Sequence, residues 1–226
     1  MQTKLAIIAA LPREIASLVK GLKPHPAFTH RAVYAYELPG AVVVAAGMGT
    51  HRVTLALEAA RAIAPISTVI SVGLAGACTP QLRPGEVADA CTIIDVRTGE
   101  RYFASEPSPH TLVTSDSIAG IAEKARLAQA YNAALVDMEA ATLARLALAH
   151  GLRFRALKAV SDGHDFELPS LSLFADKDGH FRTSAFALHT ALRPRDWGKA
   201  AQLGRDSGRA LKALDAALRK AIEDHS

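Results

Sequence analysis

The 226-residue sequence has little cysteine, few aromatic residues and no long apolar run. Its two cysteines, Cys78 and Cys91, form no CxxC pair and are too few for a disulfide framework, which favours a reducing compartment. The longest apolar runs, 5–11 and 41–46, are far shorter than the roughly 20 residues that cross a bilayer. The first residues lack the apolar segment and cleavage site of a signal peptide, so we expect a soluble, cytoplasmic protein.

A large excess of one charge is also missing. The chain has 26 basic and 22 acidic residues, a net charge of +4. The segment 193–220 alone holds eight basic and three acidic residues, so the remainder of the chain is about neutral. This distribution argues against a nucleic-acid-binding surface. Because half of the residues are hydrophobic and only 21% are charged, global disorder is excluded as well.

Short apolar runs alternate with helical patterns over the first two thirds of the chain, which predicts an α/β protein. We expect strands at 4–10, 33–38, 41–46, 68–72, 86–95, 111–114, 134–138 and 153–160. Helices are expected at 12–22, 50–64, 118–130, 139–150, 183–192 and 197–222, and an irregular loop at 97–110. The simplest organisation is one domain over 1–226, with a core over about 1–165 and a helical C-terminal extension over about 166–226.

Three carboxylates lie where predicted strands end or helices begin, the edge at which open α/β sheets bind ligands. Glu14 and Asp162 each have an ordinary structural explanation, as a helix-dipole partner and as a turn residue. Glu139 lies among apolar residues, where an unpaired carboxylate would be costly. Together the three predict a polar site at this edge, without identifying its ligand.

Other candidate motifs are weaker. The run 47–49 begins like a dinucleotide-binding fingerprint, but Arg52 stands where the third glycine is required, and a tight turn explains the glycines equally well. His164 lies near two aspartates, yet no second histidine follows at ligand spacing, so we expect no metal site. The GxSxG and GKS/T motifs are absent from the sequence.

Five sequence blocks, in order, resemble the nucleoside phosphorylase and nucleosidase superfamily. They are IIAALPRE at 7–14, GMG at 47–49, VGLAGA with LRPGEV within 72–87, VDMEA at 136–140 and VSD at 160–162. The resemblance implies a phosphorylase/hydrolase-like twisted mixed sheet flanked by helices. The pair Leu168-Pro169 and the basic tail resemble, on fewer residues, the hopanoid-associated phosphorylase subgroup.

The superfamily resemblance implies an enzyme that cleaves the N-glycosidic bond of a purine nucleoside, with adenine as the expected base. Asp162 would protonate the departing base, and Ser161 would hold the same edge of that base. Glu139 would accept hydrogen bonds from the ribose hydroxyls, Met138 would pack on the sugar, and Glu14 would orient or deprotonate the attacking water. The same resemblance implies neither a metal nor an organic cofactor.

The resemblance leaves the nucleophile open between water and phosphate as co-substrate. Arg13 stands where phosphorylases carry a phosphate-binding arginine, whereas the glutamate beside it resembles the hydrolytic branch. Leu74 replaces a phosphate-contacting serine, and Ser71 replaces an arginine. Arg31 or Arg52 would restore a cation. Gly76, in the VGLAGA block, is also implied to contact substrate.

The resemblance also implies a homo-oligomer with a small nucleoside as partner. The predicted helix 197–222 has an apolar stripe and a basic face, which fit either a helix packed on its own domain or a subunit, or a helix on a membrane surface. The membrane-surface alternative would suit a lipid-linked nucleoside such as adenosylhopane. Two other functions stay open: a methylthioadenosine/S-adenosylhomocysteine-type nucleosidase, and a non-catalytic nucleoside-binding module.

Overall fold

The computed structural model describes residues 3–168 and 194–225, and in this part of the chain ten strands form one mixed β-sheet. The strands are β1 (Lys4–Ala9), β2 (Tyr34–Leu38), β3 (Ala41–Ala45), β4 (Ile66–Ala77), β5 (Val87–Ala90), β6 (Thr92–Asp95), β7 (Arg101–Phe103), β8 (Thr111–Thr114), β9 (Leu135–Asp137) and β10 (Arg153–Asp162). The helical elements are η1 (Pro12–Glu14), α1 (Pro26–Thr29), α2 (Thr50–Ile63), α3 (Ile121–Tyr131), α4 (Ala140–Ala149), η3 (Pro194–Asp196) and α6 (Trp197–Glu223).

The long strand β4 organises the sheet. It pairs in parallel with β1 along one edge and with β10 along the other, and its last residues pair with β9 in the antiparallel sense. The remaining order runs β2-β3-β1 on one side and β9-β8-β6-β7 on the other. Because β1, β4 and β10 are parallel, their carboxyl ends meet at the same edge, where parallel sheets bind ligands.

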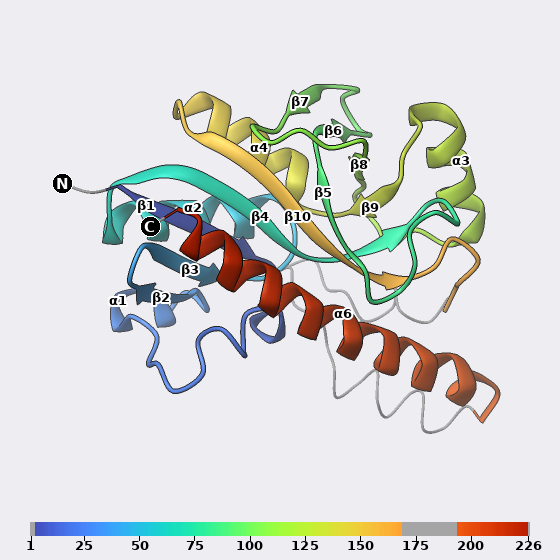
Figure 1. Cartoon of the computed structure of the whole chain (residues 1–226), viewed down its shortest axis with the longest axis horizontal. Helices are drawn as coiled ribbons and strands as arrows, with labels where there is room; N and C mark the ends of the chain where they lie inside the picture. Colours follow the sequence, from blue (N-terminus) through green and yellow to red (C-terminus); the bar gives the residue numbers. More distant parts are fainter. Residues whose placement is uncertain (1–2, 169–193, 226) are drawn as a thin grey trace.

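Helices cover both faces of the sheet (Figure 1). Helices α2 and α4 pack on one face in a cluster of mainly Ala, Val and Leu side chains. Helix α6 crosses the other face, where Leu214 and Leu218 are fully buried in a cluster that includes Leu157 and Ala159 of β10. The predicted C-terminal helix is therefore present, and it completes the core of the sheet.

The segment after β1 differs from the predicted helix 12–22. Only Pro12–Glu14 forms a short 3₁₀ helix, and a series of turns follows. Ile15, Leu18 and Val19 are buried as their spacing predicts, whereas Leu22 is 46% exposed. These turns are closed by i→i+3 and i→i+4 hydrogen bonds, which place side chains at nearly the spacing of a helix. The apolar spacing in the sequence therefore predicted a helix where the chain forms turns.

The predicted strand 86–95 is in fact two strands. β5 pairs with β10, whereas β6 pairs with β7 and β8, and the chain changes neighbours at Cys91. Similarly, the predicted loop 97–110 contains β7, a short edge strand. The pairing of β5, β6 and β7 depends on distant strands, so local periodicity does not reveal it.

Helix α2 begins at Thr50, and Gly49 is its N-cap.

The predicted helix 183–192 lies outside the described residues. In the two described stretches, no helix is both long and apolar enough to cross a membrane.

Candidate active site

A pocket of about 420 Å³ opens at the carboxyl ends of β1, β4 and β10. All seven residues predicted as catalytic or substrate-binding contribute to its lining, namely Arg13, Glu14, Gly76, Met138, Glu139, Ser161 and Asp162, whereas the alternative cations Arg31 and Arg52 do not. Helix α6 supplies one wall, named here the α6 wall, which consists of Ala200, Leu203, Gly204, Ser207, Gly208 and Leu211. The structure therefore brings together residues that are separated by up to about 150 positions in sequence, although their individual roles stay predictions.

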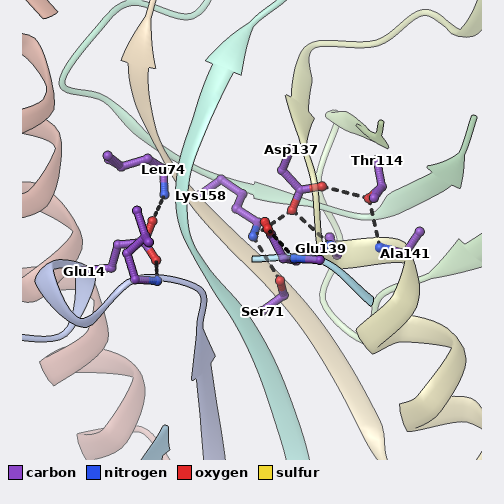
Figure 2. Close-up of polar contacts among 11 residues, drawn as sticks. Glu14, Ser71, Leu74, Thr114, Asp137, Glu139, Ala141 and Lys158 are labelled. Carbon is purple, nitrogen blue, oxygen red and sulfur yellow. Dashed lines mark hydrogen bonds and ion pairs between the residues drawn. The ribbon is translucent and has the colours of Figure 1, made fainter. Parts of the chain in front are cut away.

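Glu14 is buried at the pocket and held by main-chain donors (Figure 2). Its Oε2 accepts a hydrogen bond from Leu11 N at 2.8 Å, and its Oε1 accepts one from Leu74 N at 3.0 Å. Burial raises the pKa of Glu14 above 4.5, although these two hydrogen bonds act in the opposite direction. A carboxylate with a raised pKa is a stronger base than an ordinary glutamate.

Gly73 permits this position of Glu14. Its φ of +140° is rarely adopted by other residues, and a Cβ at Gly73 would lie only 2.8 Å from Glu14 Oε1. Gly73, the first glycine of the VGLAGA block, therefore gives the Glu14 carboxylate access to the backbone of β4.

Glu139 immediately precedes α4 and faces the glycine turn before α2. Gly49, at φ +87°, donates its N–H to Glu139 Oε1 at 3.3 Å. Burial and the neighbouring Asp137 carboxylate raise the pKa of Glu139 to about 8, whereas Lys158 acts in the opposite direction. The GMG run thus forms a turn that contacts a carboxylate, in agreement with the tight-turn interpretation. Met138 lines the same pocket beside this carboxylate.

A buried ion pair lies behind Glu139, and the sequence analysis missed it. Lys158 Nζ is 2.9 Å from Asp137 Oδ2 and donates to Ser71 Oγ at 2.9 Å (Figure 2). Asp137 also accepts hydrogen bonds from Thr114 Oγ1 at 2.7 Å and from Ala140 N at 3.0 Å. A lysine within the predicted core strand 153–160 was the available signal, because a charge inside a buried strand requires a partner. Ser71 is thereby committed to this pair.

Asp162 reaches the pocket through an irregularity at the end of β10. Val160 pairs with Ala75 and Asp162 pairs with Gly76, so Ser161 is an extra residue between them. Such a bulge changes the direction of the side chains beside it. Ser161 Oγ lies within hydrogen-bond distance of Ala75 O, at 3.2 Å, and also donates to Asp162 Oδ1. A Cβ at Gly76 would lie 3.1 Å from Asp162 Oδ2, so the glycine leaves room for the carboxyl group.

Lys124 is a second buried cation that the sequence analysis missed. It lies on α3 with 1% of its surface exposed, and its ammonium group forms an ion pair with Asp162 Oδ2. The same Nζ donates to Gly163 O at 2.8 Å and to Phe166 O at 3.2 Å. The predicted helix 118–130 contained this lysine, but no local pattern connects it to a residue 38 positions later.

The other arginines considered from the sequence have different surroundings. Arg13 is exposed and lines the pocket. Arg52 is committed to the main chain, because it donates to the carbonyl oxygens of Ala46, Arg31 and Ala32. The expectation that Arg52 supplies a cation to the site is therefore not supported by its contacts. In the described ranges, no group of three His, Cys, Asp or Glu side chains is arranged to hold a metal ion.

Comparison with known families identifies the class of this chain. The profile of the phosphorylase superfamily matches residues 4–116 and 104–192, so the chain belongs to that superfamily. This confirms the resemblance of the five sequence blocks and the predicted class of enzyme, the nucleoside phosphorylases and nucleosidases. No curated protein matches the chain.

Several solved structures share the fold at low sequence identity. A 5′-methylthioadenosine/S-adenosylhomocysteine nucleosidase from Helicobacter pylori is 14% identical with a TM-score of 0.67, and the match covers 99% of each chain. A 5′-methylthioadenosine nucleosidase from Arabidopsis thaliana is 17% identical with a TM-score of 0.67, over 100% of this chain and 96% of that one. A mutant of futalosine hydrolase from Helicobacter pylori is 16% identical with a TM-score of 0.59, over 84% of this chain and 98% of that one. These likenesses confirm the predicted α/β fold.

Proposed function

We propose that the protein hydrolyses the N-glycosidic bond of a purine nucleoside, with adenine as the base. The observation that carries this proposal is the buried carboxylate of Glu14, held by two main-chain N–H groups in the pocket that Asp162 also lines. One group suited to activating water and another suited to protonating a leaving base thus share one cavity. Membership of the phosphorylase superfamily supports the reaction class.

The reaction balances with the side chains of this pocket. Asp162 first takes a proton from solvent on Oδ1, the oxygen that is not paired with Lys124, while the Ser161 hydroxyl donates to Ala75 O. This proton is transferred to the purine ring, and the C1′–N bond breaks with its electron pair passing to the base. A water molecule forms the new bond to C1′ and gives its proton to Glu14. The proton on Glu14 then leaves to solvent, and Asp162 is reprotonated from solvent. The sequence of steps consumes one water and requires neither a metal nor an organic cofactor.

The ribose is assigned to Glu139 and Met138. The two oxygens of Glu139 suit the neighbouring hydroxyl groups of a ribose. Because its pKa is raised, Glu139 can hold a proton near neutral pH and then donate as well as accept a hydrogen bond. Hydrogen bonds to sugar hydroxyls that strengthen as positive charge develops on the ring favour bond cleavage. Met138 supplies an apolar contact for the sugar face.

Water is favoured over phosphate by the hydrogen bonds at the strand ends. The N–H of Leu74, a donor that could bind an anion, is directed at Glu14. Lys158 and Arg52 are occupied by other partners, and a phosphate near Glu14 would meet a negative charge. Phosphorolysis remains the second candidate because Arg13 lines the pocket and is exposed.

The residues of the α6 wall favour a substrate that carries a substituent at the 5′ position of the nucleoside. Its small and aliphatic residues suit an apolar group better than a charged one. The solved structure of one Helicobacter pylori relative contains 5′-methylthioadenosine, whose sulfur substituent is small. For the present chain we propose a larger apolar 5′ substituent, as in a lipid-linked adenosine such as adenosylhopane. A methylthioadenosine-type substrate is the alternative.

Three further properties belong to the same proposal. The protein is proposed to act in the cytoplasm as a homo-oligomer. Contact with a membrane surface would involve the exposed basic residues of α6, such as Arg205 and Lys212, because Leu214 and Leu218 are buried in the core. Such contact would bring the pocket close to a lipid-linked substrate.

The experiment that tests the function follows free adenine. Purified protein is incubated with adenosine, methylthioadenosine and a 5′-alkylated adenosine, each with and without phosphate. We expect adenine release in phosphate-free buffer and a loss of at least about 100-fold in kcat for Asp162→Asn. Release that requires phosphate and yields ribose 1-phosphate would replace hydrolysis by phosphorolysis. Nucleoside binding without turnover of any substrate would leave the non-catalytic binding module instead.

A further inference from the structure

We infer that Lys124 is a positioning residue for the leaving-group acid: its ammonium group fixes the Asp162 carboxyl and the turn that follows it. This inference rests on the proposed function, because it concerns the residue that protonates the base. Lys124 acts through Asp162 and is not assigned contact with the reacting atoms.

The surroundings of Lys124 account for all of its hydrogen-bonding capacity. An ammonium group has three N–H donors, and the three acceptors here are Asp162 Oδ2, Gly163 O and Phe166 O. Burial of a lysine is costly unless its charge is paired and its donors are satisfied. The 1% exposure of Lys124 is therefore compensated by one carboxylate and two carbonyl groups that all belong to the segment 162–166.

These contacts matter because Asp162 has little other support. It is the last residue of β10, and the chain beyond it continues without regular secondary structure through Leu168. Lys124 donates to Oδ2, and the Ser161 hydroxyl lies beside Oδ1 but can donate to Ala75 O instead, so Oδ1 is the oxygen that can carry the acid proton. Without the ammonium group, Oδ2 would lose its partner, and the turn would lose the two hydrogen bonds that Lys124 makes to its carbonyl groups. The carboxyl group could then rotate away from the base.

A positioning role predicts a selective kinetic defect. Correctly placed general acids accelerate reactions by about 10²–10⁴-fold, and this advantage is lost when the acid is misplaced. We expect Lys124→Met to lower kcat for an adenine nucleoside about 100-fold, while KM changes less than about threefold. A nitrophenyl riboside, whose leaving group departs without a proton, should lose less than about fivefold in kcat.

The matched control is Lys199→Met. Lys199 is exposed and donates to Glu167 O at 3.1 Å, so it contacts the chain one residue beyond the segment 162–166 without touching Asp162. This control should keep the activity of the wild type with both substrates. If Lys124→Met does not fold, as judged by circular dichroism, Lys124→Gln retains two amide donors and serves as the second variant.

A double-variant cycle provides the second readout and decides the matter if the wild type does not accept the nitrophenyl riboside. Because Lys124 acts through Asp162, adding Lys124→Met to Asp162→Asn should cost less than about threefold in kcat. Equal losses on both substrates, full additivity in the cycle, or an unchanged kcat in Lys124→Met would each overturn the inference. A wild type that releases no base would instead overturn the proposed function, and the inference with it.

Discussion

At the scale of single residues, buried charged groups at the pocket are stabilised in two ways, by ion pairs or by main-chain N–H groups. Lys158 and Lys124 each have a carboxylate partner, Asp137 and Asp162 respectively. Glu14 is held by main-chain N–H groups and forms no ion pair with another described residue. A carboxylate held in this way stays available as a base, which is the property that the proposed hydrolysis requires.

Glu139 gives a prediction on pH and stability. Because its pKa is raised to about 8, the folded protein retains a proton that the unfolded chain releases near pH 4.5. This contribution to stability is fully present below pH 4.5 and is lost as the pH rises through about 8. Above pH 8 we therefore expect Glu139→Gln to have a larger free energy of unfolding than the wild type, by on the order of 1 kcal/mol.

Urea unfolding at several pH values measures this difference. The difference in free energy of unfolding between Glu139→Gln and the wild type should shrink toward zero as the pH approaches 4.5. The control Glu58→Gln, at an exposed position, should show no such trend. A Glu139→Gln variant whose advantage grows at low pH would contradict the interpretation.

Gly73 gives a second prediction at this scale. An alanine there combines an unfavourable φ with a Cβ 2.8 Å from Glu14 Oε1, so the carboxylate must move away from Leu74 N. We expect Gly73→Ala to lower the free energy of unfolding by about 1–3 kcal/mol and to lower kcat at least tenfold. Gly99→Ala is the control, because Gly99 also has a positive φ but nothing lies within 4 Å of its Cβ position. Loss of kcat in the control as well would argue against a contact with Glu14.

At the scale of elements, α6 has two functions along its length. Its second half buries Leu214 and Leu218 against the sheet, and residues of its first half form most of the α6 wall. The apolar stripe predicted from sequence is therefore used within the protein over its second half. Any membrane contact would thus depend on the basic face of the helix.

Leu214→Ala tests the contribution of α6 to the core. Leu214 is 0% exposed, and truncation of a buried leucine costs about 2–5 kcal/mol through lost burial and the remaining cavity. Leu148→Ala on α4 provides the comparison, because Leu148 is 73% exposed and its truncation should cost less than about 1 kcal/mol. Both variants are measured by chemical denaturation at one pH. Equal costs for the two would show that α6 contributes little to the core.

At the scale of the whole molecule, one sheet and its helices bring distant residues into one cavity. Glu14, Gly76, Glu139 and Asp162 come from four separate stretches of sequence and share the carboxyl edge of the sheet. This arrangement explains why the three carboxylates could be predicted as one site from their positions at strand ends. The organisation of residues 1–226 as a single domain stays a prediction, which the packing of α6 on β10 supports.

The sequence by itself determined most of the alternation of strands and helices, the family and the seven predicted site residues that line the pocket. These features are encoded locally, in apolar runs, turn residues and short ordered blocks. The partners of Lys158 and Lys124, the division of 86–95 into two strands, and the turns after Glu14 were decided only by the tertiary structure. The physical reason is that a buried charge or a strand edge is stabilised by whichever group the fold brings beside it, and that group lies far away in sequence.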